Sequence, residues 1–192
     1  RLNNGVVYQA SNRPNYKEEN KFFDSRDWLE ADIVYDGQLF KSVYLKYDLV
    51  IDKVILEYPP AGELQLIDQL VSSFSISGHQ FTRLDDGRIE KGFYEIFFDG
   101  KIKLYEKHHK VFVKSIEQQR VVLQYISRNQ TYLFKDGNYY QVKSNGSFYN
   151  IFEKETTKAL KKYARANSIS INKDGRGAMV RLAKYYLESI DD

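Results

Sequence analysis

The chain of 192 residues contains no cysteine, and this absence excludes several kinds of chemistry. Disulfide bonds, thiol nucleophiles and thiolate metal sites all require cysteine. The sequence also has no run of roughly 20 apolar residues, the length that a membrane-spanning helix needs. Prolines number only three, and there is one tryptophan and one methionine. A chain of this length can bury a sizeable hydrophobic core without disulfides or metals, so we expect one domain.

Tyrosine and phenylalanine are abundant instead, with 16 and 12 copies. Flat aromatic rings pack well on a pleated surface, so this composition favours strands. The net charge is +3, but residues 1–90 carry ten basic and fifteen acidic groups, whereas residues 91–192 carry nineteen basic and eleven acidic groups. Such an imbalance can steer a charged partner, although an ordinary solvated surface also produces it.

Three Asp-Gly pairs, at residues 36–37, 99–100 and 136–137, separate short runs of β-branched and aromatic residues. This pair tolerates positive φ angles and is typical of two-residue hairpin turns. The recurrence predicts an antiparallel meander. Further strands are expected at residues 43–47, 53–58, 64–67, 71–76, 111–116 and 121–127.

The hydrophobic period changes from two to about 3.6 beyond Phe152, which predicts two amphipathic helices. The first covers residues 153–166. The second follows Asp174 and carries its apolar stripe on Met179, Leu182, Ala183, Tyr186 and Ile190. A connection over residues 167–177 would be too long for the short turn of a helix-turn-helix motif.

These elements predict an α+β fold, in which an antiparallel β-meander, either a sandwich or a partly open barrel, precedes the two helices. We expect one domain over residues 1–192. It comprises an irregular N-terminal segment (1–30), a β-rich body (31–152) and a helical C-terminal segment (153–192).

Residues suited to catalysis or metal binding form no recognisable motif. His108 and His109 are adjacent on a predicted strand, so their side chains point to opposite faces and cannot share one ion, and His79 stands in a polar turn. Asp48 and Asp52 could form a carboxylate pair, but their spacing equally fits turn residues. We therefore predict no catalytic residue, no metal site and no cofactor.

The basic residues are the more substantial candidates for a binding site. Lys101, Lys103, Tyr105 and Lys107 share one parity of a predicted strand, which would place cations and an aromatic ring on one exposed face. A second cluster lies in the predicted helices, where residues 158–184 contain eight basic groups and a single acid. Its first four members, Lys158, Lys161, Lys162 and Arg165, complete the predicted binding surface. The same residues could simply form the solvated side of amphipathic helices.

The order of segments resembles a group of uncharacterised exported proteins of the Bacteroidetes. The resemblance rests on short segments spread over nearly the whole chain: residues 2–5, Trp28, 33–40, 43–48, Phe74, Phe81, 92–95, 98–100 and 182–186. It implies a cleaved export signal and a periplasmic, outer-membrane-associated or secreted location, and it implies no known activity. A chain beginning at Arg1 rather than Met is compatible with a removed signal and also with a shortened chain.

By elimination, the sequence favours a non-enzymatic exported binding module, an accessory component of a cell-envelope complex whose partner is an outer-membrane or envelope protein. Three alternatives stay open. The first is a hydrolase that acts on glycan or peptidoglycan with paired carboxylates, and the second is a β-barrel that holds a small ligand. The third is nucleic-acid binding through the C-terminal basic residues, which a sequence pI of about 8.8 disfavours.

Overall fold

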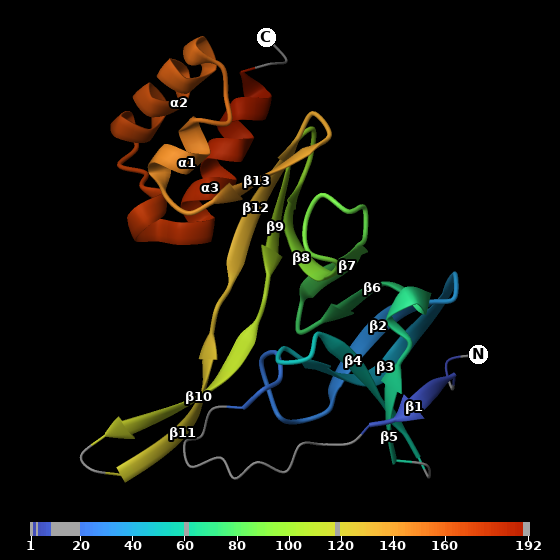
Figure 1. The fold of residues 1–192 in the computed structure, drawn as a ribbon. Helices are drawn as coiled ribbons and strands as arrows, with labels where there is room; N and C mark the ends of the chain where they lie inside the picture. The colour runs from blue at the N-terminus through green and yellow to red at the C-terminus, as the bar shows by residue number, and fades with distance from the viewer. Residues whose placement is uncertain (1, 3, 9–19, 60–61, 118–119, 190–192) are drawn as a thin grey trace. The chain divides into compact units, whose positions relative to one another are not determined.

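The computed structural model describes residues 2, 4–8, 20–59, 62–117 and 120–189. It is mostly antiparallel β-sheet followed by C-terminal helices, which confirms the predicted fold class (Figure 1). Contacts between Cα atoms divide the chain into two compact units. The first unit is Arg1–Glu95 with Lys107–Asn129, and the second is Ile96–Glu106 with Gln130–Asp192. The expectation of a single domain stays a prediction, because a division into compact units does not show whether either unit folds without the other.

The first unit contains most of the strands. In order along the chain they are β1 (Gly5–Val7), β2 (Leu29–Tyr35), β3 (Gln38–Asp48), β4 (Lys53–Tyr58), β5 (Gly62–Leu66), β6 (Val71–Ile76), β7 (His79–Leu84), the start of β8 (Gly92–Asp99), β10 (Lys110–Glu117) and β11 (Arg120–Ser127). A short 3₁₀ helix, Asp68–Leu70, precedes β6. The strand order is β1-β5-β4-β3-β2-β6-β7-β8, and β10 and β11 form a separate two-stranded sheet. The order is linear, so the sheet does not close into a barrel.

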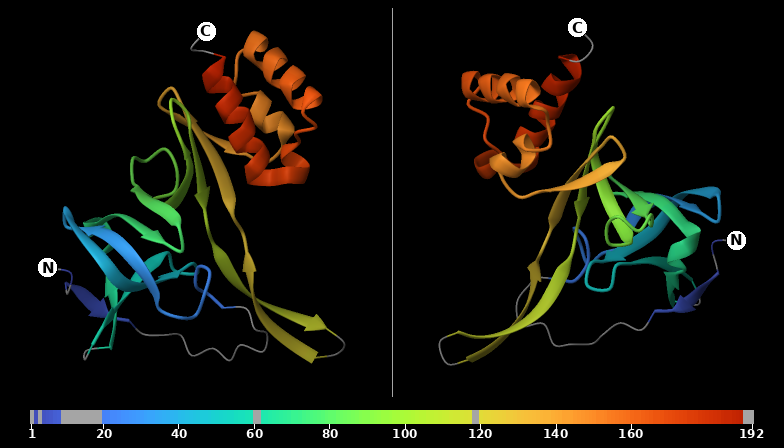
Figure 2. Two further views of the ribbon diagram at one scale, coloured as in Figure 1. Left: turned by 180° about the vertical axis from the view of Figure 1, so that it is seen from behind. Right: turned by 45° about the horizontal axis from the view of Figure 1, so that its top comes forward.

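The second unit combines the end of β8 with β9 (Lys103–Lys107), β12 (Gln130–Lys135) and β13 (Asn138–Val142), in the order β8-β9-β12-β13. Lys107, the last residue of β9, belongs to the first unit. Three helices complete the second unit: α1 (Asn145–Tyr149), α2 (Lys154–Ala166) and α3 (Ile171–Glu188). Two further views show these helices packed together (Figure 2).

Two of the three predicted Asp-Gly hairpins have the expected geometry. Asp36 and Gly37 have φ angles of 50° and 74°, and Asp136 and Gly137 have 49° and 75°. Positive φ at both central residues is the type I′ turn, whose twist matches that of the flanking strands. The turn after Asp99 differs, because Gly100 does not have a positive φ angle and residues 100–102 connect β8 to β9. Ser77 and Gly78 also have two positive φ angles, 50° and 77°, and form a third turn of type I′. This turn places His79 in β7 rather than in a loop.

Strand β3 is longer than predicted because a bulge replaces the expected break. The pairing of β2 with β3 shifts between Ala31 and Ile33. At the shift Ser42 has a φ angle of 52°, and its backbone N–H donates to Asp32 Oδ1 at 3.0 Å. A carboxylate that satisfies the unpaired amide allows one strand to continue through the irregularity. The part of the predicted N-terminal segment that the structure describes also contains ordered pairing, namely β1 and a bridge between Phe22 and Asp48.

Each unit has its own hydrophobic core. The core of the first unit is rich in aromatic rings: Phe74 and Phe81 stack at 4.8 Å, and Tyr47 meets both rings edge-on at 5.3 Å. The core of the second unit lies between the helices and β9, β12 and β13, and includes Leu104, Leu133 and Leu182, which are completely buried. The abundance of tyrosine and phenylalanine is thus used inside the molecule as well as on its surface.

The helical segment differs from the prediction at its start and in its middle. Helix α1 was not expected; Ser144 caps it, because its side chain accepts from the Ser147 N–H in a reciprocal capping box. Helix α3 begins at Ile171, before Asp174, and bends at Gly175, where φ is 52° and ψ is −125°. The α2–α3 connection is therefore residues 167–170, so the exclusion of a helix-turn-helix on connection length was wrong. Ile190, the last member of the predicted stripe, lies outside the described residues.

Candidate functional site

The sequence predicted one exposed face formed by Lys101, Lys103, Tyr105 and Lys107, in and just before β9. This prediction is wrong for Tyr105 and Lys107. Lys101 is exposed and Lys103 is half-buried beside Asp99, with a distance of 2.5 Å from Nζ to Oδ1. Tyr105 and Lys107, however, are only 6% and 5% exposed. Residues 104–108 are all buried, so protein covers both faces of the strand from Leu104 onward. Alternation between buried and exposed positions holds only where one face of a sheet meets solvent, and that condition fails here.

Lys107 instead forms part of a buried polar network in the first unit. Its ammonium group pairs with Asp52 Oδ2, and Tyr47 donates to the other oxygen, Oδ1, at 2.5 Å. The ammonium also lies 5.1 Å from the centre of the Tyr94 ring. A methyl group at Gly92, whose φ angle is 145°, would come within 2.0 Å of Asp52 Oδ2. The ion pair in its observed position thus occupies the space that a side chain at residue 92 would need.

A cavity of about 420 Å³ adjoins this network and contains the best-placed carboxylates of the first unit. Asp52, Asp68 and Glu90 line it; Asp52 is held by Tyr47 and Lys107, and Asp68 pairs with Lys53 through Oδ2, while its buried Oδ1 has no hydrogen-bond partner. A general acid or base needs a proton-transfer position that faces the substrate. Asp52 is therefore committed to neighbouring groups, which fits a structural role, whereas Asp68 keeps one oxygen without a partner.

Asp48, the other half of the carboxylate pair considered in the sequence, is 1% exposed. It accepts from the Tyr8 hydroxyl at 2.5 Å, from the Val50 N–H at 3.0 Å, and pairs with Lys21 at 3.0 Å. Burial, followed by the hydrogen bond to Asp48, raises the pKa of Tyr8 far above its usual value. Asp48 therefore ties residues near the N-terminus to the turn after β3, as a turn residue would.

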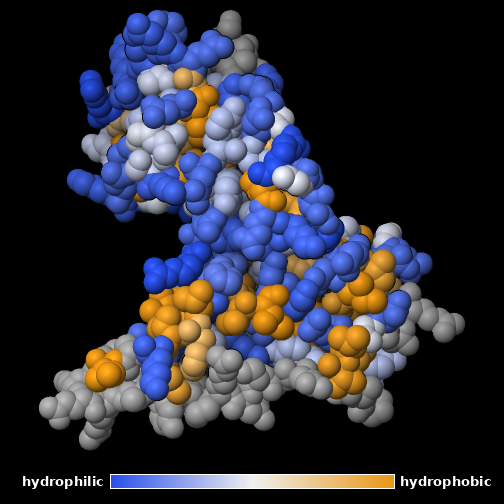
Figure 3. Space-filling view, viewed as in Figure 1, coloured by the Kyte–Doolittle hydropathy of each residue, from blue (hydrophilic) through white to orange (hydrophobic). Residues whose placement is uncertain are grey.

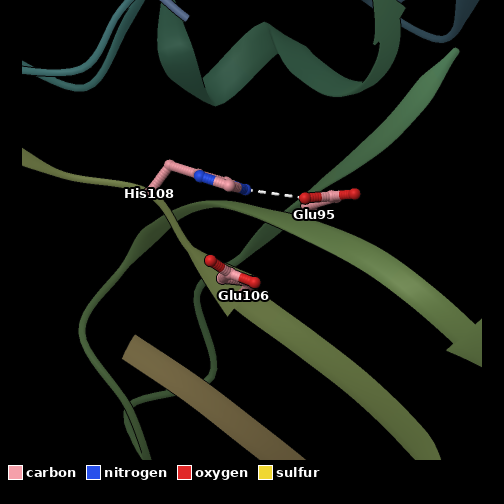
Figure 4. Close-up of side chains that lie close together, drawn as sticks. All are labelled: Glu95, Glu106 and His108. Carbon is pink, nitrogen blue, oxygen red and sulfur yellow. Dashed lines mark hydrogen bonds and ion pairs between the residues drawn. The ribbon is translucent and has the colours of Figure 1, made fainter. Parts of the chain in front are cut away.

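Two histidines share one buried carboxylate, which the sequence did not predict; Figure 4 shows one of them, His108, beside Glu95. Glu95, which is 3% exposed, binds two imidazoles: Oε1 lies 2.7 Å from His79 Nδ1 and Oε2 lies 2.6 Å from His108 Nε2. Asn129 Nδ2 lies 3.3 Å from the remaining nitrogen of His108. Figure 4 also labels Glu106, which belongs to the second unit, where Arg176 pairs with it at 3.4 Å.

The two N···O distances around Glu95 are those of hydrogen bonds. If Glu95 is ionised, both facing nitrogens carry protons, so neutral His79 is the Nδ1–H tautomer and neutral His108 the Nε2–H tautomer. His79 and His108 are 29 positions apart, and Glu95 lies 16 positions after the first and 13 before the second. Nothing in the sequence pattern could have revealed that they share one carboxylate.

The helical basic cluster is exposed as predicted. Lys158, Lys161, Lys162 and Arg165 all lie at the surface of α2, and Figure 3 shows hydrophilic side chains over the helices at its upper left. Lys158 pairs with Glu155 at 2.9 Å. Within the described part of the chain, no carboxylate lies within ion-pair distance of Lys161, Lys162 or Arg165.

A cavity of about 420 Å³ in the second unit brings together two of these cations and a third from α3. It is lined by Lys161, Arg165 and Lys173, together with the neutral residues Asn145, Tyr149, Ala164, Ser168, Ile169 and Ser170. No carboxylate occurs among the described residues that line it. Lys173 belonged to the basic run seen in the sequence, but its place beside Arg165 depends on the short α2–α3 connection.

Tyr149 lines this cavity and interacts with two cations of α2, Lys161 and Arg165. The Lys161 ammonium lies 5.5 Å from the centre of its ring. Burial raises the pKa of the Tyr149 hydroxyl, and the positive charge of Arg165 opposes that rise. The cations therefore lie beside an aromatic surface, which is the combination that suits an anion attached to an organic group.

No protein-family model matches the chain, and neither a curated protein nor a solved structure is detectably similar to it. The resemblance to exported proteins of the Bacteroidetes therefore stays a prediction. None of the helices in the described part of the chain is long and apolar enough to cross a membrane.

Proposed function

We propose that the protein is a non-enzymatic exported binding module, an accessory component of a cell-envelope complex, and that α2 docks it on an acidic surface of a protein partner. The exported location is taken from the resemblance to the Bacteroidetes group. The docking surface is the α2 face, defined as Lys158, Lys161, Lys162 and Arg165.

The observation that carries the proposal is the spacing of these cations on one exposed helix. Positions 158, 161, 162 and 165 follow the pattern i, i+3, i+4 and i+7, so they share one face. Like charges at i and i+4 destabilise a helix, and this face contains two such pairs, 158 with 162 and 161 with 165. Only Lys158 has a carboxylate partner among the described residues. A binding partner that supplies negative charge would relieve this repulsion.

The same face could bind nucleic acid, so the experiment must separate the two partners. The sheet does not close around a ligand, and Asp48 and Asp52 are engaged with neighbouring groups. The open sheet therefore offers no support for a ligand-holding barrel, and the engaged carboxylates offer none for a hydrolase. The exposed cations of α2 do support docking. Docking on protein is favoured over nucleic acid because the net charge of the whole chain is only +3.

The test is affinity purification of the tagged protein from gently solubilised native envelopes, followed by mass spectrometry. We expect a stoichiometric envelope protein that survives nuclease treatment and is lost when Lys158, Lys161, Lys162 and Arg165 are all replaced by Gln. The matched control replaces four exposed cations of the first unit, Lys41, Lys91, Lys114 and Arg128, with Gln, and should retain the partner. Recovery of the chain alone, or loss of all bound material on nuclease treatment, would overturn the proposal.

A further inference from the structure

The cavity between α2 and the start of α3 has a composition that suits a ligand smaller than a protein. We infer that it binds a phosphate monoester, with the phosphate held by Lys161, Arg165 and Lys173 and the organic group placed against Tyr149. This inference goes beyond the docking proposed above. It involves Lys173, which is not part of the α2 face, and it does not involve Lys158 or Lys162.

The charge of the cavity points to an anion with more than one negative charge. Three cations line it, and none of the described lining residues is acidic. The nearest acid along α3 is Asp174, which pairs with Arg181 at 3.3 Å and accepts from the Ser170 N–H at 3.2 Å. A single carboxylate would leave two cations uncompensated, whereas a phosphate monoester carries up to two charges and three acceptor oxygens.

Side chains rather than the helix terminus would hold the anion. At the start of α3, the Ile171 N–H already donates to Asn145 Oδ1 at 2.8 Å, and the Ser170 N–H donates to Asp174. Lys161, Arg165 and Lys173 are exposed and have no carboxylate partner among the described residues, so their donors can turn toward a ligand without breaking an ion pair. Arg165 can supply two parallel N–H donors to one phosphate.

The size and the apolar lining account for an organic group. A cavity of about 420 Å³ lies in the range of small-molecule sites and is far larger than one phosphate needs. Ala164, Ile169 and Tyr149 supply apolar lining, each through the small part of its side chain that is not buried. Removing part of a phenyl ring from water against these side chains favours an ester over the free anion. We therefore expect phenyl phosphate to bind about tenfold more tightly than inorganic phosphate.

The experiment is isothermal titration of the full chain with inorganic phosphate, phenyl phosphate and, as a singly charged comparison, benzoate. Losing a charge-assisted hydrogen bond weakens binding by about tenfold or more. We expect Arg165→Gln and Lys173→Gln each to weaken phenyl phosphate binding by about that factor. Lys162→Gln, which removes the same charge from an exposed position outside the cavity, should change it by less than about twofold.

The phosphate could belong to a soluble molecule or to a lipid headgroup, and a second arm separates these sources. Phosphatidylcholine vesicles with and without phosphatidic acid are tested for co-sedimentation with the same variants. Binding to phosphatidic acid vesicles that depends on Arg165 and Lys173, together with weak binding of phenyl phosphate, assigns the lipid. Strong phenyl phosphate binding with no vesicle binding assigns a soluble ester.

Two results would overturn the inference. One is that neither phosphate, phenyl phosphate nor the vesicles bind. The other is that Lys162→Gln weakens binding as much as Lys173→Gln, since that would mean a diffuse attraction to α2. Lys173→Gln should leave partner recovery unchanged in the purification experiment, and Lys158→Gln should leave phosphate binding unchanged, so each proposal can fail without the other.

Discussion

Lys107 and Asp52, which lie 55 positions apart in the chain, form an ion pair in which the lysine side chain is only 6% exposed. The pair is completed by the Tyr47 hydroxyl on the other oxygen of Asp52. A lysine that the strand pattern assigned to a solvent-facing binding surface is thus part of the internal structure of the first unit. Its substitution should affect stability rather than binding.

Replacing Lys107 with Met should lower the free energy of unfolding by about 3 kcal/mol, because Asp52 would lose its counter-ion while still surrounded by protein. This is the lower end of the range for buried pairs, since Asp52 itself is 25% exposed. Urea denaturation followed by circular dichroism measures the change. The matched control is Lys103→Met, because Lys103 pairs with Asp99 at the surface and should contribute less than about 1 kcal/mol. Equal effects of the two substitutions would refute the buried role of Lys107.

Gly92→Ala should disrupt the same pair from the backbone side. The added methyl group would overlap both Asp52 Oδ2 and Lys107 Nζ, at 2.0 and 2.2 Å. Gly87→Ala is the control, because Gly87 also has a positive φ angle, 79°, but open space around its Cβ position. The free energy of unfolding of the control should fall by only about 1–2 kcal/mol, the cost of placing an alanine at a positive φ angle. Thermal denaturation should show a clearly larger loss for Gly92→Ala, and similar losses would show that the pair can move aside.

Tyr47 should make the folded state sensitive to alkali. Burial, followed by the charge of Asp52, raises the pKa of its hydroxyl well above 10. Above pH 10 the unfolded chain therefore loses this proton while the folded chain keeps it. The contribution of Tyr47 to the free energy of unfolding is thus fully present below pH 10 and is lost as the pH rises above 10. The expected contribution is about 1.4 kcal/mol per pH unit for one such group.

The measurement compares urea denaturation of the native chain and of Tyr47→Phe at pH 9 and pH 11. The other tyrosines and the lysines titrate in both chains, so they cancel in the difference. The native chain should lose about 1 kcal/mol more than the variant over this interval. An identical loss in both chains would mean that Tyr47 ionises normally in the folded state.

His79 and His108 should have opposite tautomers at a pH where imidazoles are neutral. An ionised Glu95 accepts at His79 Nδ1 and at His108 Nε2, which requires a proton on each of these nitrogens. Nitrogen-15 NMR at about pH 8.5 distinguishes the two forms. His109, which does not contact Glu95, provides an internal comparison within the same spectrum. The same tautomer at His79 and His108 would contradict the shared carboxylate.

Removing Glu95 should also destabilise the first unit. In Glu95→Ala the buried His108 would lose its acceptor, and an unsatisfied buried donor costs about 1–3 kcal/mol. His109→Ala, at a half-buried position outside this network, should change stability by less than about 1 kcal/mol. Differential scanning calorimetry of both variants provides the test, and an unchanged midpoint for Glu95→Ala would rule out a structural role for the network.

Local signals predicted much of the secondary structure. The Asp-Gly turns at 36–37 and 136–137 and the strands β4 and β6 are where the sequence placed them. Such features depend on the backbone preferences of a few neighbouring residues, which can be predicted from the sequence alone. The same reasoning failed for β7 and α1, whose turn and cap are formed by serine, a residue that also occurs in ordinary loops.

The candidate sites were predicted in part. The exposed cations of α2 were recognised because helical spacing identifies the residues of one face. Lys107 and Tyr105 were misplaced, because strand parity does not say whether a face meets solvent or another layer of protein. Glu95, His79 and His108 were not associated at all, since their meeting depends on the register between strands that are distant in the chain.

The sequence by itself determined the succession of antiparallel strands and C-terminal helices, the two Asp-Gly turns and the basic face of α2. Only the tertiary structure decided that Asp52 holds Lys107, that Glu95 joins two histidines, and that Lys173 meets Arg165 beside Tyr149. The reason is physical. Turns and helix faces arise from interactions between residues a few positions apart, whereas partners of buried charges and cavity walls arise from the packing of distant segments.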